Sequence, residues 1–254
     1  KTTAEMNELF GDIPDALENT IEIFNKVEHY SIEHAPLLPK PLLPEGVDEV
    51  EHLARLAFEG AYERFGKPLL AEVKERLKAE LKIINRNGYP AYFLMWHEII
   101  AAAHELGAQV GPGRGSAACS LVLYCLGITQ VNPLRFGLEF GGFFNIEHAL
   151  PRMEVELDKL GREKVLKWIV ERYGEESVAN IATPNYFTPK IITAEFPQAQ
   201  KLVGVVRKMD IHSCGVALCA GDISERAPLA FVESAEYENA VVVTQYGAEQ
   251  LKRM

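Results

Sequence analysis

The sequence predicts an α+β fold, helical in its first half and mixed in its second half. Between residues 14 and 106 apolar residues recur every three or four positions, which is the spacing of amphipathic helices. After residue 178 come short apolar runs that are typical of strands. A chain of 254 residues can bury a substantial core, as one large domain or as a main domain with a helical appendage.

The formal net charge of −10 limits the classes of function that fit the chain. Broad nonspecific binding of nucleic acid depends on clustered Lys and Arg, so an acidic chain argues against it, although a local basic patch is compatible. No apolar run reaches membrane-spanning length and no signal peptide is present, so we expect a cytoplasmic protein. Because the chain opens with Lys1 and ends at Met254 in what reads as the middle of a helix, we expect a fragment.

Four helices are predicted before residue 107. Pro14 begins the first helix, and the proline-rich stretch 36–44 forms an extended connector to the second. The second helix ends at Gly66, the third before Gly88 and the fourth at Gly107. We expect their apolar stripes to pack in a core; the stripes include Leu17, Ile21, Phe24 and Val27, then Val50, Leu53, Ala57 and Ala61, then Leu70, Val73, Leu77, Leu81 and Ile84, and finally Tyr92, Phe93 and Trp96.

A glycine-rich loop over residues 110–115 is the central motif of the chain. Gly111, Gly113 and Gly115 allow a tight backbone turn, and residues 116–126 read as one buried helix capped by Ser116. Unpaired loop amides, a helix N-terminus and the cation Arg114 would then gather at one spot, which suits a phosphate. A sharp strand-to-helix turn without a ligand is the alternative, and the loop alone leaves both open.

Residues 152–158, RMEVELD, alternate with period two and predict a strand. Met153, Val155 and Leu157 would face the core, while Glu154 and Glu156 share the opposite face. Two carboxylates placed shortly after a phosphate loop are hard oxygen ligands for a divalent cation. The solvated face of an edge strand is the alternative, and the residues alone favour it.

The rest of the chain predicts further elements but no metal centre. We expect a helix over 164–173, a strand over 178–182, a proline-broken connector over 183–198, and short strands at 214–219, 229–232 and 240–245. The cysteines lack CxxC spacing, so we expect buried free thiols at Cys119, Cys125, Cys214 and Cys219. His97 and His104 can share one helix face, and we interpret them as ordinary, partly buried histidines.

Residues 110–140, VGPGRGSAACSLVLYCLGITQVNPLRFGLEF, resemble the palm signature of the bacterial replicative DNA polymerase III alpha subunit, a C-family polymerase. The upstream segments LFGDIPDALENTIEI, LPEGVDEVEHLARLAFEGAYERFG and LKIINRNGYPAYFLMWHEII resemble the part that joins the PHP domain of that family to its palm. Downstream, GREKVLKWIVERYGEESVANIAT resembles the helix and strand after the catalytic strand, and HSCGVALC and VVVTQYG resemble later palm strands. The resemblance covers nearly the whole chain.

The resemblance implies a fold, a domain division and partners. The fold would be a polymerase-beta-like nucleotidyltransferase palm, a mixed sheet with flanking helices, over residues 91–254, preceded by a helical linker segment over residues 1–90. The thumb of the family would be reduced to residues 184–210, and the fingers and PHP domain would be missing. The partners implied are dNTP, primer-template DNA and other replisome subunits, with no membrane, and the oligomeric state stays open.

The resemblance also implies roles for individual residues. The nucleotide-binding residues would be Gly113, Arg114, Gly115 and Ser116, with Gly115 and Ser116 as the GS motif that contacts the triphosphate. Glu154 and Glu156 would be the catalytic, metal-binding carboxylates, with Mg²⁺ as the cofactor of a two-metal phosphoryl transfer.

The carboxylate segment departs from the pattern of the family. The family's PDFDIDF is PRMEVEL here, so Arg152 replaces its first Asp, and its two metal-binding Asp fall on Glu154 and Glu156. Each Glu adds a methylene and moves its carboxylate by about 1 Å, which can cost about a hundredfold in rate. The family's third Asp, in a K-x-D-F-L-G motif, would come after Met254.

The resemblance with these departures implies a palm fragment or shortened relative that is inactive as this chain. A noncatalytic nucleotide-binding or protein-binding scaffold derived from the palm is the alternative.

Overall fold

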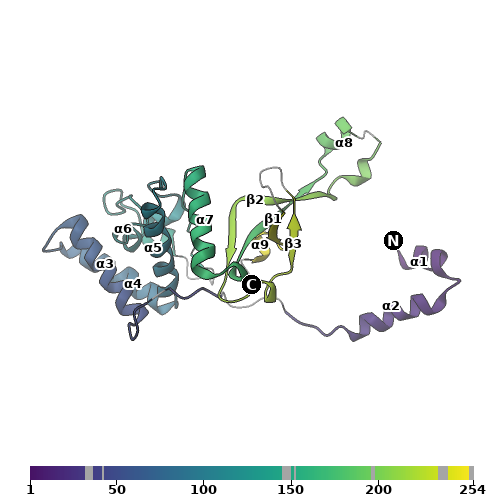
Figure 1. The fold of residues 1–254 in the computed structure, drawn as a ribbon, viewed down its shortest axis with the longest axis horizontal. Coiled ribbons are helices and arrows are strands. Elements are labelled where there is room, and N and C mark those ends of the chain that lie inside the picture. Colours follow the sequence, from purple (N-terminus) through teal and green to yellow (C-terminus); the bar gives the residue numbers. More distant parts are fainter. Residues whose placement is uncertain are drawn as a thin grey trace. The chain divides into compact units, whose positions relative to one another are not determined.

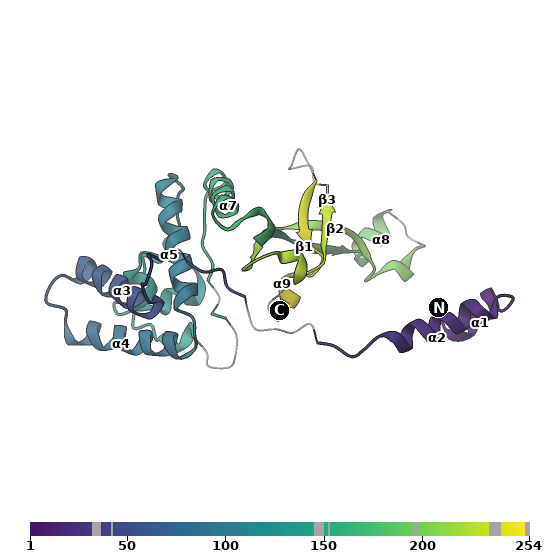
Figure 2. The ribbon, with the colours of Figure 1, turned by 60° about the horizontal axis from the view of Figure 1, so that its bottom comes forward.

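The computed structural model describes residues 1–31, 37–41, 43–144, 150–151, 153–195, 198–233 and 240–251 (Figures 1 and 2). The chain divides into two compact units, Lys1–His34 and Ala35–Met254. None of the described helices combines the length and the apolar character needed to cross a membrane. The domain boundary expected at residue 90 stays a prediction.

The first unit consists of two helices, α1 (Thr3–Phe10) and α2 (Pro14–Lys26). The sequence predicted α2 from Pro14 and missed α1, which begins with a capping box between Thr2 and Glu5. The expected core packing of the α2 stripe is wrong for the described residues. Ile21 is 63% exposed and Phe24 76% exposed, and neither α1 nor α2 contains a buried residue.

Three predicted helices come first in the second unit: α3 (Glu49–Phe65), α4 (Ala71–Arg86) and α5 (Pro90–Glu105). Asp48 caps α3 by accepting from two backbone N–H groups of its first turn, and Gly66 with φ +79° ends it. Most residues of their stripes are buried as predicted and form one continuous core, in which Leu53, Leu77 and Phe93 are fully buried. The expected burial is wrong for Val50 and Leu70, which are 38% and 71% exposed.

The predicted helix over 116–126 is two separate elements, so that prediction is wrong. A 3₁₀-helix, η1 (Gly115–Cys119), is followed by the short helix α6 (Leu121–Cys125). The chain is extended at Ser120, whose hydroxyl accepts from the backbone N–H of Leu123 and caps α6. Ser120, rather than Ser116, is therefore the capping residue.

Close backbone packing joins α3 to α6. A Cβ atom at Gly60 would lie 1.9 Å from the carbonyl oxygen of Cys125, so only glycine fits at this crossing. The neighbouring α3 residues Ala57 and Ala61 are fully buried. Small residues along α3 thus set the distance between the two helices.

The predicted strand over 152–158 is wrong among the described residues. Residues 153–156 are not part of a strand, and Leu157 makes one isolated antiparallel bridge with Val110. The alternation of side chains does follow the prediction, because Met153 is buried while Glu156 is exposed. Helix α7 (Lys159–Tyr173) follows, and Gly174 ends it as predicted.

A mixed sheet of β1 (Val178–Tyr186), β2 (Val206–Leu218), β3 (Leu229–Val232) and β4 (Val241–Thr244) follows α7. In the described residues the strand order is β2-β1-β4-β3; β1 and β4 are parallel and the other neighbours antiparallel. Figures 1 and 2 show α7 between the sheet and α5. The mixed α+β class predicted from the sequence is confirmed.

The connector expected over 183–198 is partly regular, which corrects the prediction. Strand β1 continues through Pro184 to Tyr186, and α8 (Pro189–Glu195) follows. The remaining elements are short: η2 (Phe140–Gly142), η3 (Glu175–Ser177), η4 (Gln200–Leu202), η5 (Ile223–Glu225) and α9 (Ala248–Leu251).

Candidate functional site

The glycine loop is tight, as its composition predicts. Gly113 has φ +129° and Gly115 has φ +62°, both in the region that favours glycine. Gly111 has no such backbone but lies against Glu156, since a Cβ there would be 3.0 Å from the Glu156 Cβ. Two glycines therefore provide the turn, and the third allows a close approach.

The carboxylate segment runs beside this loop, although residues 116–151 lie between them in the chain. The backbone N–H of Gly111 donates to the carbonyl oxygen of Glu156 at 2.9 Å, next to the Val110–Leu157 bridge. One residue further along, Asp158 accepts from the backbone N–H of Gln109 at 2.8 Å. The pairing places Glu156 directly next to the loop.

Arg114 joins the loop to both predicted metal-binding carboxylates. Its Nε lies 3.1 Å from Oε2 of Glu154, and its Nη1 lies 3.3 Å from Oε1 of Glu156. The Arg114 side chain is 61% exposed and that of Glu156 56%, whereas that of Glu154 is 33% exposed. Exposed ion pairs of this kind contribute about 0–1 kcal/mol each, so they are readily exchanged for other partners.

The other predicted nucleotide-binding residues follow Arg114 or precede it directly. Gly115 and Ser116 form the start of η1, where Gly115 is exposed and Ser116 is half-buried. The structure thus places the whole predicted set of residues 113–116 within one short loop and turn. Arg152 lies outside the described residues.

The N-terminus of α6 is occupied by a carboxylate that the sequence analysis missed. Glu80 of α4 is 1% exposed and accepts from the Ser120 hydroxyl at 2.8 Å and from the backbone N–H groups of Leu121 and Val122, each at 3.0 Å. The N-terminus of α6 is therefore already occupied by a side chain of the protein. The phosphate site predicted beside Ser116 falls at the start of η1 instead, and it stays a prediction.

Arg76 completes this buried arrangement. Its Nε lies 2.6 Å from Oε1 of Glu80, and its Nη2 donates to the carbonyl oxygens of Cys119 and Leu138. One ion pair thus fixes the end of η1, the start of α6 and residue 138 to helix α4. A signal for Glu80 is present in the sequence, since it lies three residues after Leu77 and four before Ile84, on the buried stripe of α4.

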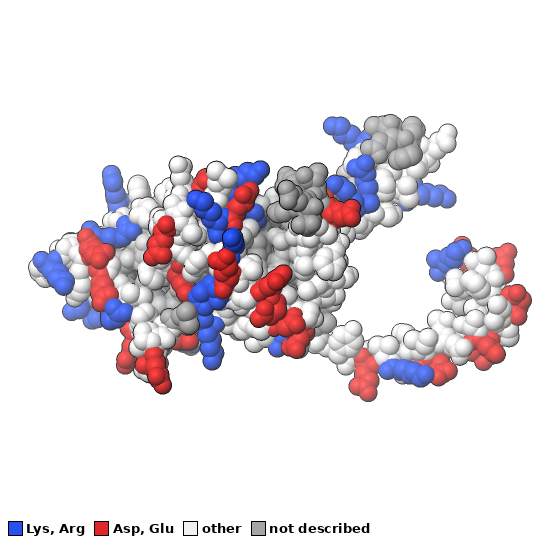
Figure 3. Space-filling view, viewed as in Figure 1, with Lys and Arg blue, Asp and Glu red and all other residues white. Residues whose placement is uncertain are grey.

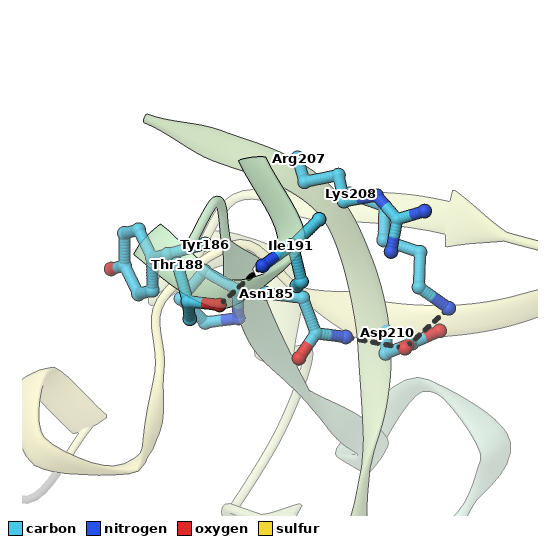
Figure 4. Close-up of a pocket in the computed structure, with 8 residues that line it drawn as sticks. Asn185, Tyr186, Thr188, Ile191, Arg207, Lys208 and Asp210 are labelled. Carbon is cyan, nitrogen blue, oxygen red and sulfur yellow. Dashed lines mark hydrogen bonds and ion pairs between the residues drawn. The ribbon is translucent and has the colours of Figure 1, made fainter. Parts of the chain in front are cut away.

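A second polar recess lies at the end of the β1–β2 pair, with a volume of about 440 Å³ (Figure 4). Its cation Lys208 lies 2.7 Å from Asp210, which also accepts from the side-chain amide of Asn185. Lys and Arg side chains surround α8 in Figure 3. Arg207 also lines this recess, but its lining contains none of the positive-φ glycines that shape the glycine loop, so it offers weaker support for an anion site than that loop does.

Most of the cysteines and histidines singled out by the sequence are buried or half-buried, but His104 is exposed, so its expected partial burial is wrong. All four cysteines carry free thiols, but Cys214 is exposed, so its expected burial is wrong. Burial raises the pKa of the Cys125 thiol to about 12. His97 Nδ1 lies 2.9 Å from the carbonyl oxygen of Leu126. Within the described ranges, no three His, Cys, Asp or Glu side chains are grouped to hold a metal ion.

Residues 51–195 match the family described as the bacterial DNA polymerase III alpha NTPase domain. The chain belongs to this family. The matched region contains α4 with Glu80, the glycine loop and the carboxylate segment, so the DNA polymerase III alpha match covers every residue of the candidate site.

Individual relatives agree with this assignment. The DNA polymerase III subunit alpha of Borreliella burgdorferi is 37% identical over 198 residues, which is 77% of this chain and 17% of the relative. The subunits of Pseudomonas fluorescens and Caulobacter vibrioides are 35% and 36% identical over 79% and 82% of this chain, and 18% and 19% of the relatives. The chain spans about a fifth of the length of these relatives.

Proposed function

We propose that this chain is the nucleotide-binding palm of a DNA polymerase III alpha relative, with a polymerase-beta-like nucleotidyltransferase fold. Under this proposal residues 91–254 are the palm, with its thumb reduced to residues 184–210, and residues 1–90 are the helical linker segment. The single observation that carries the proposal is the position of Arg114, whose side chain reaches both Glu154 and Glu156. Loop and carboxylates therefore belong to one site.

The loop side of the site suits the triphosphate of a dNTP. Gly113 and Gly115 shape a backbone turn around Arg114, and exposed N–H groups of such a turn bind phosphate oxygens. Gly115 and Ser116 would donate to the phosphates from the start of η1. Arg114 would bind the same anion by charge-assisted hydrogen bonds.

The carboxylate side suits a Mg²⁺ ion whose remaining ligands are water and the phosphate oxygens of the substrate. Glu154 and Glu156 supply hard oxygens, and Mg²⁺ sites commonly combine one or two carboxylates with water and substrate phosphates. Mg²⁺ bound there supplies charge neutralisation and activates an attacking hydroxyl. With two protein carboxylates, the site depends on phosphate oxygens to complete its ligands.

The reaction class of the site is nucleotidyl transfer from dNTP on primer-template DNA, within an assembly of replisome subunits. We infer that this chain by itself is impaired or inactive in that reaction. Glu154 and Glu156 extend their carboxylates further than the Asp residues of the family pattern, and Arg114 neutralises part of their charge.

Binding and extension assays test the two parts of this proposal. We expect dATP with Mn²⁺ to raise the melting temperature of the chain, and Arg114→Ala to abolish this shift at the same dATP concentration while leaving weak binding at higher concentrations. Arg55→Ala is the matched control, since Arg55 also forms an exposed ion pair, with Glu59 on α3. Primer extension should stay at background; clear extension would overturn the inactivity.

A noncatalytic scaffold is the second candidate, and the ion pairs of Arg114 favour it, because a carboxylate pair with an internal counter-ion needs no metal. A protein-binding scaffold would show no shift of the melting temperature with dATP or Mn²⁺, alone or together. A nucleotide-binding scaffold would show the same shift with dATP whether or not Mn²⁺ is present. The same thermal titration therefore decides between the two candidates.

A further inference from the structure

Arg114 occupies the oxygens that a divalent cation would use. It bridges Oε2 of Glu154 and Oε1 of Glu156 with two different nitrogens of one guanidinium. A guanidinium and a metal ion compete for such oxygens, because each needs the same lone pairs. The described site therefore contains its own counter-ion.

The Arg114 side chain is also positioned so that it can exchange the two carboxylates for another anion. Its backbone is shaped by the two turn glycines, Gly113 and Gly115, while its side chain is 61% exposed. Exposed ion pairs are weak and screened, so a more highly charged anion can take the guanidinium. A triphosphate at the loop offers several negative charges and planar pairs of oxygens that suit the arginine fork.

We propose that Arg114 is an exchangeable counter-ion, held by Glu154 and Glu156 without nucleotide and transferred to the triphosphate when nucleotide binds. This inference rests on the proposed function. The transfer exposes both carboxylates to Mg²⁺ at the moment when phosphate ligands for the metal arrive. Nucleotide and metal then bind with positive coupling, and each raises the affinity for the other by the same factor.

The exchange can be told apart from a model in which the carboxylates contact phosphate only through a bound metal. The two models predict different effects of removing the carboxylate charges on metal-free phosphate affinity. Without any metal, the carboxylates hold Arg114 away from the nucleotide. Removing their charge by Glu154→Gln with Glu156→Gln should therefore tighten metal-free binding of tripolyphosphate, by about fivefold at the lower end of typical couplings. If the carboxylates act on phosphate only through a metal, the same change leaves metal-free binding as it was.

A double-mutant cycle separates the exchange from general charge repulsion. We would measure tripolyphosphate binding in EDTA by calorimetry for the 254-residue chain, the Glu double variant, Arg114→Gln and the triple variant. The exchange requires the gain from the Glu changes to fall below about twofold when Arg114 is absent. An equal gain with and without Arg114 would mean plain repulsion and overturn the proposal.

Metal binding without phosphate supplies an independent readout. Arg114→Gln should bind Mn²⁺ alone about fivefold more tightly than the original chain, because the competing cation is gone. Arg55→Gln, which alters an exposed pair on α3, should leave Mn²⁺ affinity unchanged. Unchanged or weaker Mn²⁺ binding by Arg114→Gln would contradict the exchange.

The outcomes distinguish this inference from the proposed function. If dATP binds with Mn²⁺ but the effects in the double-mutant cycle are additive, the proposed nucleotide site stands and the exchange of Arg114 is refuted. Failure of every variant to bind tripolyphosphate or dATP, with or without Mn²⁺, would remove both.

Discussion

The hydroxyl of Ser120 donates to the carboxylate of Glu80 at 2.8 Å, and both side chains are almost completely buried. This contact caps α6 from a helix that lies forty residues earlier in the chain. It fixes η1, the 3₁₀-helix that follows the glycine loop, to the buried face of α4.

Removing Glu80 should be strongly destabilising. Glu80→Ala leaves Arg76 and two backbone N–H groups without their carboxylate, and breaking a buried ion pair in this way costs about 3–5 kcal/mol. Urea unfolding followed by circular dichroism measures the loss. Glu75→Ala is the control on the same helix, because its side chain is 73% exposed, and it should change stability by no more than about 0.5 kcal/mol.

If Glu80→Ala does not fold, the contribution of Glu80 to stability can be measured with Glu80→Gln instead. Gln keeps the shape but removes the charge, so it should still destabilise the chain more than Glu75→Gln does. Equal midpoints for the two Gln variants would contradict the role of Glu80.

Gly60→Ala should separate α3 from α6. The added Cβ would lie 1.9 Å from the Cys125 carbonyl oxygen, and overpacking of this kind costs about 1–3 kcal/mol or more. Thermal unfolding by calorimetry measures the effect. Gly141→Ala is the matched control, since a Cβ there meets nothing within 4 Å, and a comparable loss in both variants would refute the close packing.

The stability of the chain should fall in acid partly through Asp158. Hydrogen bonds from the backbone N–H groups of Gln109 and Gly161 hold the pKa of this carboxyl below its ordinary value of 3.8. Its stabilising effect is therefore complete above pH 3.8, and it is lost as the pH falls through the lower pKa of the folded state.

Unfolding of the original chain and of Asp158→Asn by urea, measured between neutral and acid pH, tests this effect. The original chain should be the more stable at neutral pH. The difference should shrink in acid, because a protonated Asp158 and an Asn bind the same N–H groups similarly. A difference that stays constant with pH would show that the charge of Asp158 contributes nothing.

The thiols should differ in reactivity towards iodoacetamide. Cys214 is exposed, whereas burial raises the pKa of Cys125 to about 12, so little of its reactive thiolate exists at neutral pH. Mass spectrometry of the folded chain should find alkylated Cys214 and unmodified Cys125. Alkylation in urea is the control, since both should react there, and rapid labelling of folded Cys125 would contradict its burial.

Patterns carried by neighbouring residues allowed the predictions that succeeded. The helices ending at Gly66 and Gly174 and the strand over 229–232 depend on local periodicity and glycine stops, and the structure confirms them. Arg114 and Glu154 were also predicted as parts of one site, and the structure brings them within 3.1 Å. Their roles with nucleotide and metal stay predictions.

The predictions that failed depended on distant partners. The helix over 116–126 breaks at Ser120 because Glu80, forty residues away, binds the N–H groups of α6. The alternation over 152–158 is real, but the segment meets only the short edge at Val110, so it makes one bridge. The apolar stripe of α2 lacks a buried surface to cover, which no periodicity reveals.

The single bridge between Val110 and Leu157 implies that the site can open while the core stays folded. Among the described residues, the backbone hydrogen bond from Gly111 to Glu156 and the exposed ion pairs of Arg114 hold residues 153–157 to the loop. Weakly held segments detach at a lower free energy than global unfolding. The amide hydrogen of Gly111, which donates across this junction, would then exchange with deuterated solvent faster than amides within α5. Formation of the junction between the glycine loop and the carboxylate segment is thus a separate equilibrium of the folded chain, which the ligands of the proposed function would shift.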